Sequence, residues 1–416
     1  MSALFAQDNS NTILLLGATA HIGNGEVIQN SAIGIKDGTI ELIVDATTAR
    51  FDRTAYSEIV DITGKHVYPG FIAAATNMGL REIGAVRATA DDYEVGDFNP
   101  HVRSAIAFNT DSRVIPTVRS NGVLLAQVTP LGGRIQGTSS IMHLSGWNWE
   151  DALVKENDAI HMRWPQLMQR SGWWGNPGPV ERSESYDDVV AELADFFDQA
   201  KAYSEESTPN PKNLRFEAMR DVFDGSKKVF IRCRTPKEIT EVIRFGEKYK
   251  LDYVLVDAAF ALEVADLIKE YDVPLILEQT HRLPPYSHSD YDQPYKTPAL
   301  LAEAGIKFGL TQGSGWDAFW DFRNLPFHAA QAIPYGLNPE TALASITGDL
   351  AEILGLDNYG TLENGKDATL IVSEGDVLDV MTNNITHAWI HGQAVDLDDK
   401  QKQLNRKFRE KFNLND

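Results

Sequence analysis

The chain has 416 residues, of which 43% are hydrophobic, so it can bury the core of one very large domain or two ordinary ones. Its 59 acidic residues outnumber its 38 basic residues, and the formal net charge of −21 argues against nucleic acid or an anionic membrane as a partner. No apolar run approaches the ~20 residues of a membrane-spanning helix, and a single cysteine, Cys233, excludes an internal disulfide and a cysteine-based metal cage.

Residues 1–10 have two interpretations. The small residues around Ala6 resemble the end of a secretory signal peptide, which would make the protein periplasmic or secreted. The alternative is a disordered terminus on a cytoplasmic protein, because the apolar region of a signal peptide is absent. The residues themselves leave both interpretations open.

Short strands broken by glycine turns are predicted near both ends of the chain, in residues 11–67 and 359–398. Gly23-Asn24-Gly25 and Lys36-Asp37-Gly38 have hairpin-turn chemistry between alternating segments. The two segments therefore predict one small composite β domain, a β-sandwich, followed by a helical tail over residues 399–416.

Strands and helices alternate in residues 68–358. Apolar strands are predicted at 229–231, 253–256, 274–277 and 307–310, and helical spacing of Ile239, Val242 and Ile243 predicts a helix after the first of them. Parallel βα units over this length predict a (β/α)₈ TIM barrel, whose active site would lie at the C-terminal ends of the strands.

Four stretches resemble the amidohydrolase superfamily, and within it the imidazolonepropionase-like branch. In chain order they are VYPGFIAAATNMGL from Val67, REIGAVRATADDYEVGDFNP from Arg81, GGRIQGTSSIMHLSG from Gly132 and GTLENGKDATLIV from Gly360. The resemblance implies a barrel that holds one or two divalent metals, usually zinc, which activate water for attack on a C–N bond. It also implies five ligand residues: a His-x-His pair after strand one, a His after strand five, often a His after strand six, and an Asp after strand eight.

Every one of these ligand positions is substituted in this sequence. The His-x-His pair reads Ala75 and Asn77, strand five ends in Arg232, strand six ends in Asp257, and Gly313 stands at the Asp position, or Gln312 if the alignment slips by one. Alanine and glycine have no ligand atom, and a guanidinium repels a dication. We therefore expect no metal and no confident catalytic residue.

Arg232 and Asp257 would end adjacent strands, which predicts an ion pair that plugs the vacated site. Together with Asn77 and His281 they are the candidate ligand-binding residues. His288 and His328 lie in the same region but lack ligand spacing, and so does His281. Cys233 should face a helix, because strand neighbours alternate. The acidic run of Glu82, Asp91, Asp92 and Glu94 is interpreted as a polar surface loop rather than a calcium site.

These observations favour a catalytically silent pseudoenzyme subunit that assembles with itself or with an active relative. Family resemblance alone suggests an alternative, a hydrolase of non-peptide C–N bonds of the cyclic amide, imide or amidine type with a shifted or absent metal. A second alternative is a small-molecule binding protein that uses the emptied barrel mouth.

Overall fold

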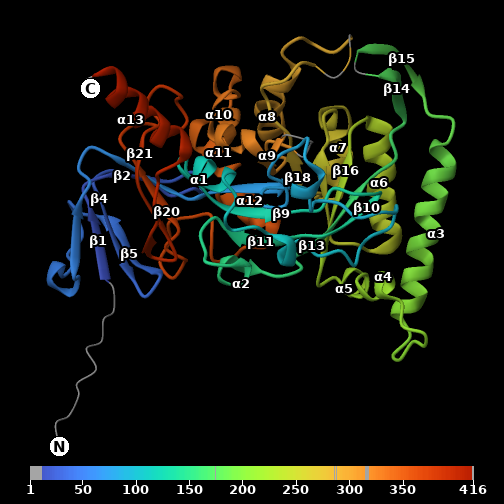
Figure 1. Ribbon diagram of the computed structural model, residues 1–416, viewed down its shortest axis with the longest axis horizontal. Coiled ribbons are helices and arrows are strands. Elements are labelled where there is room, and N and C mark those ends of the chain that lie inside the picture. Colours follow the sequence, from blue (N-terminus) through green and yellow to red (C-terminus); the bar gives the residue numbers. More distant parts are fainter. Residues whose placement is uncertain (1–11, 174, 285, 287, 314–317, 415–416) are drawn as a thin grey trace, which may run out of the picture.

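The computed structural model describes residues 12–173, 175–284, 286, 288–313 and 318–414, so the signal-peptide prediction for residues 1–10 lies outside it. The structure is mixed α/β, with strands of the N-terminal segment and the C-terminal helix α13 (Lys400–Phe412) near one end and the long helix α3 (Tyr186–Ser204) at the other (Figure 1). Within the described ranges, no helix combines the length and the apolar character needed to cross a bilayer.

Two sheets at the first end contain the strands that were predicted near the termini. One sheet has the order β5 (Thr39–Asp45), β4 (Ser31–Lys36), β1 (Thr12–Leu16) and β6 (Glu58–Asp61). The other has the order β22 (Gln393–Ala394), β21 (Ile385–Ile390), β20 (Leu370–Ser373), β7 (His66–Pro69), β2 (Thr19–His21) and β3 (Val27–Ile28). Strands from both termini thus pair directly, and side chains of both sheets share one hydrophobic cluster.

The turn between β4 and β5 shows why this end folds as predicted. Asp37 and Gly38 both have positive φ, 49° and 80°, which is the requirement of the tight hairpin turn that matches strand twist. Gly38 also contacts the ring of His391 so closely that a Cβ there would lie 2.5 Å from it.

The middle of the chain forms two further sheets. The larger has the order β10 (Ile135–Thr138), β13 (Ala159–Arg163), β16 (Lys228–Cys233), β17 (Tyr253–Asp257), β18 (Leu275–Leu277) and β19 (Phe308–Leu310), and all its pairs from β13 onward are parallel. The smaller has the order β12 (Leu153–Lys155), β11 (Ser140–His143), β9 (Val123–Val128) and β8 (Phe71–Thr76). Strand pairing divides this region into two sheets, so the closed barrel stays a prediction.

Helices follow the parallel strands as the periodicity predicted. α6 (Pro236–Tyr249) begins with a capping box between Thr235 and Glu238 and buries Ile239 and Val242. After β17, a 3₁₀ turn over Ala261–Val264 precedes the short helix α7 (Ala265–Glu270). The other helices are α1 (Val114–Arg119), α2 (Trp149–Ala152), α4 (Leu214–Glu217), α5 (Arg220–Phe223), α8 (Gln293–Glu303), α9 (Ala318–Asp321), α10 (Leu325–Ala330), α11 (Pro339–Ala344) and α12 (Gly348–Leu354).

A two-stranded ribbon projects beside α3 at the far end of the molecule (Figure 1). It consists of β14 (Met168–Trp173) and β15 (Asn176–Arg182), which pair antiparallel. Its base lies close to the ends of β13 and β16, where Gln169 and Ser183 help to line a cavity.

Candidate functional site

At the end of β8, Asn77 belongs to a buried ion-pair network. Its amide donates to Asp92 Oδ2 at 2.9 Å, and Arg81 grips the same carboxylate with two bonds, Nε–Oδ2 at 2.7 Å and Nη2–Oδ1 at 2.8 Å. Only 5% of the Arg81 side chain and none of Asp92 is exposed. The prediction that the whole acidic run is surface loop is therefore wrong for Asp92, while Asp91 and Glu94 are exposed as expected.

Ala75, the other position of the substituted pair, is buried within β8 and has a left-handed backbone with φ of 50°. Its amide nitrogen donates to Gln127 Oε1 at 3.2 Å. Gln127 in turn donates to Asp158, so hydrogen bonds within the protein fix the end of β8. Ala75 has no ligand atom in its side chain, and of the Asn77 amide only the nitrogen is hydrogen-bonded, whereas Oδ1 is buried without a hydrogen-bond partner.

Arg232 and Asp257 lie in one charged cluster, but the ion pairs found for them differ from the predicted one. Strand register places Arg232 opposite Val256 and places Asp257 opposite Cys233, so the two side chains leave the sheet on different faces. Arg232 forms its ion pair with Glu278, which lies two residues beyond the register partner of Val256 and so returns to the Arg232 face.

Asp257 is held by two other arginines. Its buried carboxylate accepts from Arg234 at 2.7 Å and from Arg282 at 3.3 Å. Burial opposes the charge of Arg232, but Glu278 and Asp257 outweigh it and raise the pKa of Arg232. The site that was predicted to hold one ion pair thus holds a network of three arginines and two carboxylates.

The resemblance predicts that Gly313 matches a metal-binding Asp, and the surroundings of Gly313 disfavour a side chain at this position. Its φ is 90°, and a Cβ built on it would lie 2.8 Å from Glu278 Oε1. The neighbouring Gln312, the alternative alignment, donates to Gln279 at 3.1 Å. Glu278 therefore fills the space into which a side chain at position 313 would extend.

The three histidines of this region differ in their exposure to solvent. His281 and His288 are exposed, whereas His328 is buried in α10, and burial followed by the nearby His281 lowers the pKa of His328 to about 4. Cys233 is buried as expected, and burial raises its pKa well above the ordinary value, so it is not an activated nucleophile.

Sequence reasoning missed a buried polar chain inside the strands. His161 of β13 lies 3.0 Å from Ser139 Oγ, which donates to Asp158 at 2.6 Å. Burial and then the charge of Arg232 lower the pKa of His161 to about 3, while burial raises the pKa of Asp158. A histidine in the middle of an apolar strand, AIHMR, was the only sequence signal for it.

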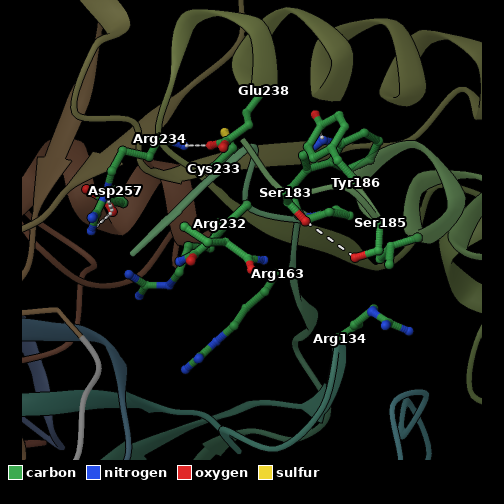
Figure 2. Close-up of a pocket in the computed structure, with 15 residues that line it drawn as sticks. Arg134, Arg163, Ser183, Ser185, Tyr186, Arg232, Cys233, Arg234, Glu238 and Asp257 are labelled. Carbon is green, nitrogen blue, oxygen red and sulfur yellow. Dashed lines mark hydrogen bonds and ion pairs between the residues drawn. The ribbon is translucent and has the colours of Figure 1, made fainter. Parts of the chain in front are cut away.

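A cavity of about 420 Å³ opens beside the ends of β13 and β16 (Figure 2). Its lining residues carry four guanidinium groups and two carboxylates, together with hydroxyl, amide and aromatic groups: Arg134, Arg163, Trp164, Pro165, Gln166, Gln169, Ser183, Ser185, Tyr186, Val189, Arg232, Cys233, Arg234, Glu238 and Asp257. The cavity thus shares Arg232 and Asp257 with the charged network.

These residues do not fit a divalent metal. Among the residues that the structure describes, no group of three His, Cys, Asp or Glu side chains could hold one. The five positions that the resemblance predicts to match family ligands present a guanidinium, a carboxylate already bound by two arginines, an amide bound to Asp92, an alanine and a glycine. A guanidinium donates only, and it repels a dication.

The sequence matches no family model and no curated protein, but solved structures share its architecture. An amidohydrolase from Thermotoga maritima MSB8 superposes with a TM-score of 0.76 at 22% identity, over 92% of this chain and 99% of that one. Molinate hydrolase superposes with a TM-score of 0.59 at 14% identity, over 93% of this chain and 95% of that one. A Xaa-Pro dipeptidase with bound methionine superposes with a TM-score of 0.55 at 15% identity, over 92% of this chain and 100% of that one. The chain has the fold of the amidohydrolase superfamily.

Proposed function

We propose that this chain is a catalytically silent member of the imidazolonepropionase-like branch, a pseudoenzyme that acts through assembly. The observation that carries the proposal is the position of Glu278. Its carboxylate lies where a Cβ at position 313 would extend, and it also pairs with Arg232. One ion pair within the chain thus occupies two of the predicted ligand positions.

The proposal includes a barrel, formed by the two middle sheets, and a β-sandwich at the other end. Main-chain bonds from Leu310 to Ser345 and from Ile72 to Ile346, at 2.8 and 3.0 Å, support closure between β19 and β8. Ser139 bonds the main chain of Ala159 at 2.9 Å on the opposite side. The hydrophobic cluster shared by the two terminal sheets supports the sandwich.

The zinc content of the purified protein tests whether the chain is catalytically silent. After incubation with zinc and removal of excess, we expect far less than one zinc per chain by elemental analysis, because Arg232 and its network leave no open ligand set. A matched variant restores the ligands with Ala75→His, Asn77→His, Arg232→His, Asp257→His and Gly313→Asp, and adds Glu278→Ala to make room. Stoichiometric zinc in the unmodified chain would refute the proposal and favour the hydrolase alternative.

Assembly is supported by the surface of α13. Leu404, Phe408 and Phe412 recur every four residues and are 38%, 53% and 59% exposed. The helix carries six basic residues and one acidic residue on a chain of net charge −21, so it complements the acidic surface of a second copy. We propose a second copy of this chain as the occupant of this face, with an active relative as the other outcome of the test.

Phe408→Glu is expected to shift the chain from dimer to monomer in light scattering at micromolar concentration, because it places a charge in the centre of the apolar face. Val380→Glu, at a residue that is 66% exposed elsewhere, is the matched control and should leave the dimer intact. A monomeric unmodified chain would contradict self-assembly and leave the relative to be sought by co-purification.

A further inference from the structure

One guanidinium in the cavity of Figure 2 has no hydrogen-bonded counter-charge, because the carboxylate that acts on it, Glu278, is paired with Arg232. Arg163 is the last residue of β13, and its Nε is buried without an acceptor. Among the described residues, its side chain takes part in no hydrogen bond or ion pair, and no dashed line reaches it in Figure 2. A largely buried, unpaired charge is costly, so its presence calls for a partner from outside the described chain.

The carboxylates of the cavity cannot serve as that partner, because each is already engaged. Glu238 accepts from the backbone N–H groups of Leu167, Arg234 and Thr235, at 2.8, 2.8 and 3.0 Å. Asp257 is shared by Arg234 and Arg282. The cavity therefore keeps an excess of positive charge at Arg163.

Neighbouring cations increase this excess. Arg163 and Arg232 are register partners on adjacent parallel strands, so their side chains leave the sheet side by side. Burial and then the charge of Arg232 lower the pKa of Arg163, and Glu278 opposes them only in part, so the charged form is disfavoured. An anion bound beside Arg163 would offset both unfavourable effects.

We propose that this cavity binds a small organic oxyanion, a carboxylate or a phosphate ester, with Arg163 as its anchor. The planar fork of a guanidinium matches two oxygens of such a group. The Ser183 and Ser185 hydroxyls, which lie 3.3 Å apart and also line the cavity, are further donors, and about 420 Å³ suits a small ligand (Figure 2). This inference goes beyond the silent-subunit proposal, since it requires neither a metal nor a partner chain.

The experiment measures binding of three probes at matched ionic strength: succinate, inorganic phosphate and neutral succinamide. We expect succinate or phosphate to raise the melting temperature and to bind in calorimetry, and succinamide to do neither. The stronger of the two anions identifies the ligand class. Arg163→Gln should weaken binding at least about tenfold, whereas Arg50→Gln removes an exposed arginine far along the sequence and should not.

The stability of the Arg163→Gln variant without ligand is a second test of the unpaired charge. Arg163→Gln should raise the melting temperature of the free protein by on the order of 2 °C, because it removes an unpaired buried charge. If it fails to fold, Arg163→Lys keeps the charge but loses the fork, and should weaken binding about tenfold. The proposal is overturned if no oxyanion binds, if Arg163 variants bind like the unmodified chain, or if Arg50→Gln loses binding equally.

Discussion

Replacing Asp92 by asparagine should lower the free energy of unfolding by about 3–5 kcal/mol. The substitution keeps the shape of the side chain but removes the carboxylate charge that faces Arg81, to which Arg81 donates two hydrogen bonds. Both partners are almost fully buried, so water cannot take the place of the lost charge. Urea unfolding followed by tryptophan fluorescence would measure the change.

Two further variants separate the charge from the packing. Asp91→Asn is the matched control, because Asp91 is exposed one residue away, and it should change stability by less than about 0.5 kcal/mol. Adding Arg81→Met to Asp92→Asn removes both charges and should recover most of the loss. Equal effects of the Asp91 and Asp92 variants would contradict the buried pair.

Acid should destabilise the protein through His161 before most carboxylates titrate. The pKa of His161 is lowered from 6.5 to about 3 in the folded state, so the unfolded chain takes up the proton first. Its contribution to stability is complete above pH 6.5 and is lost as the pH falls from about 6.5 to 3. The slope is about 1.4 kcal/mol per pH unit, or about 4–5 kcal/mol over the window.

The slope of stability against pH tests this prediction independently of the absolute stability. His161→Gln should flatten the slope between pH 6.5 and 4 by about 1.4 kcal/mol per unit. His143 and His328, whose pKa values burial lowers to about 4, still contribute in that variant. An unchanged slope in His161→Gln would contradict the assignment.

How far the sequence predicts this structure depends on the range of the interaction. Apolar runs located the parallel strands to within one or two residues, and helical spacing predicted the helix α6, because both signals are local. The substituted ligand positions could be identified by resemblance. The partners of Arg232 could not, because they depend on strand register and on Glu278, which is 46 residues away along the chain.

The burial of charged and titratable side chains is the second feature that could not be predicted from the sequence. Asp92 lies in a run that is acidic and mostly exposed, so composition gave no reason to separate it from Asp91. The role of His161 could not be predicted either, because it depends on Ser139 and Asp158, which only the fold brings beside it.

The contact between Gly313 and Glu278 has a consequence for the routes by which this protein could change. An aspartate at position 313 meets the Glu278 carboxylate, removal of Glu278 strips Arg232 of its ion pair, and loss of Arg232 leaves Glu278 with only its longer ion pair to Arg282, at 3.7 Å. Each lone step back towards a metal site is therefore penalised, and only concerted replacement avoids the penalty. Restoring a metal site in the laboratory should therefore require replacing Gly313, Glu278 and Arg232 together.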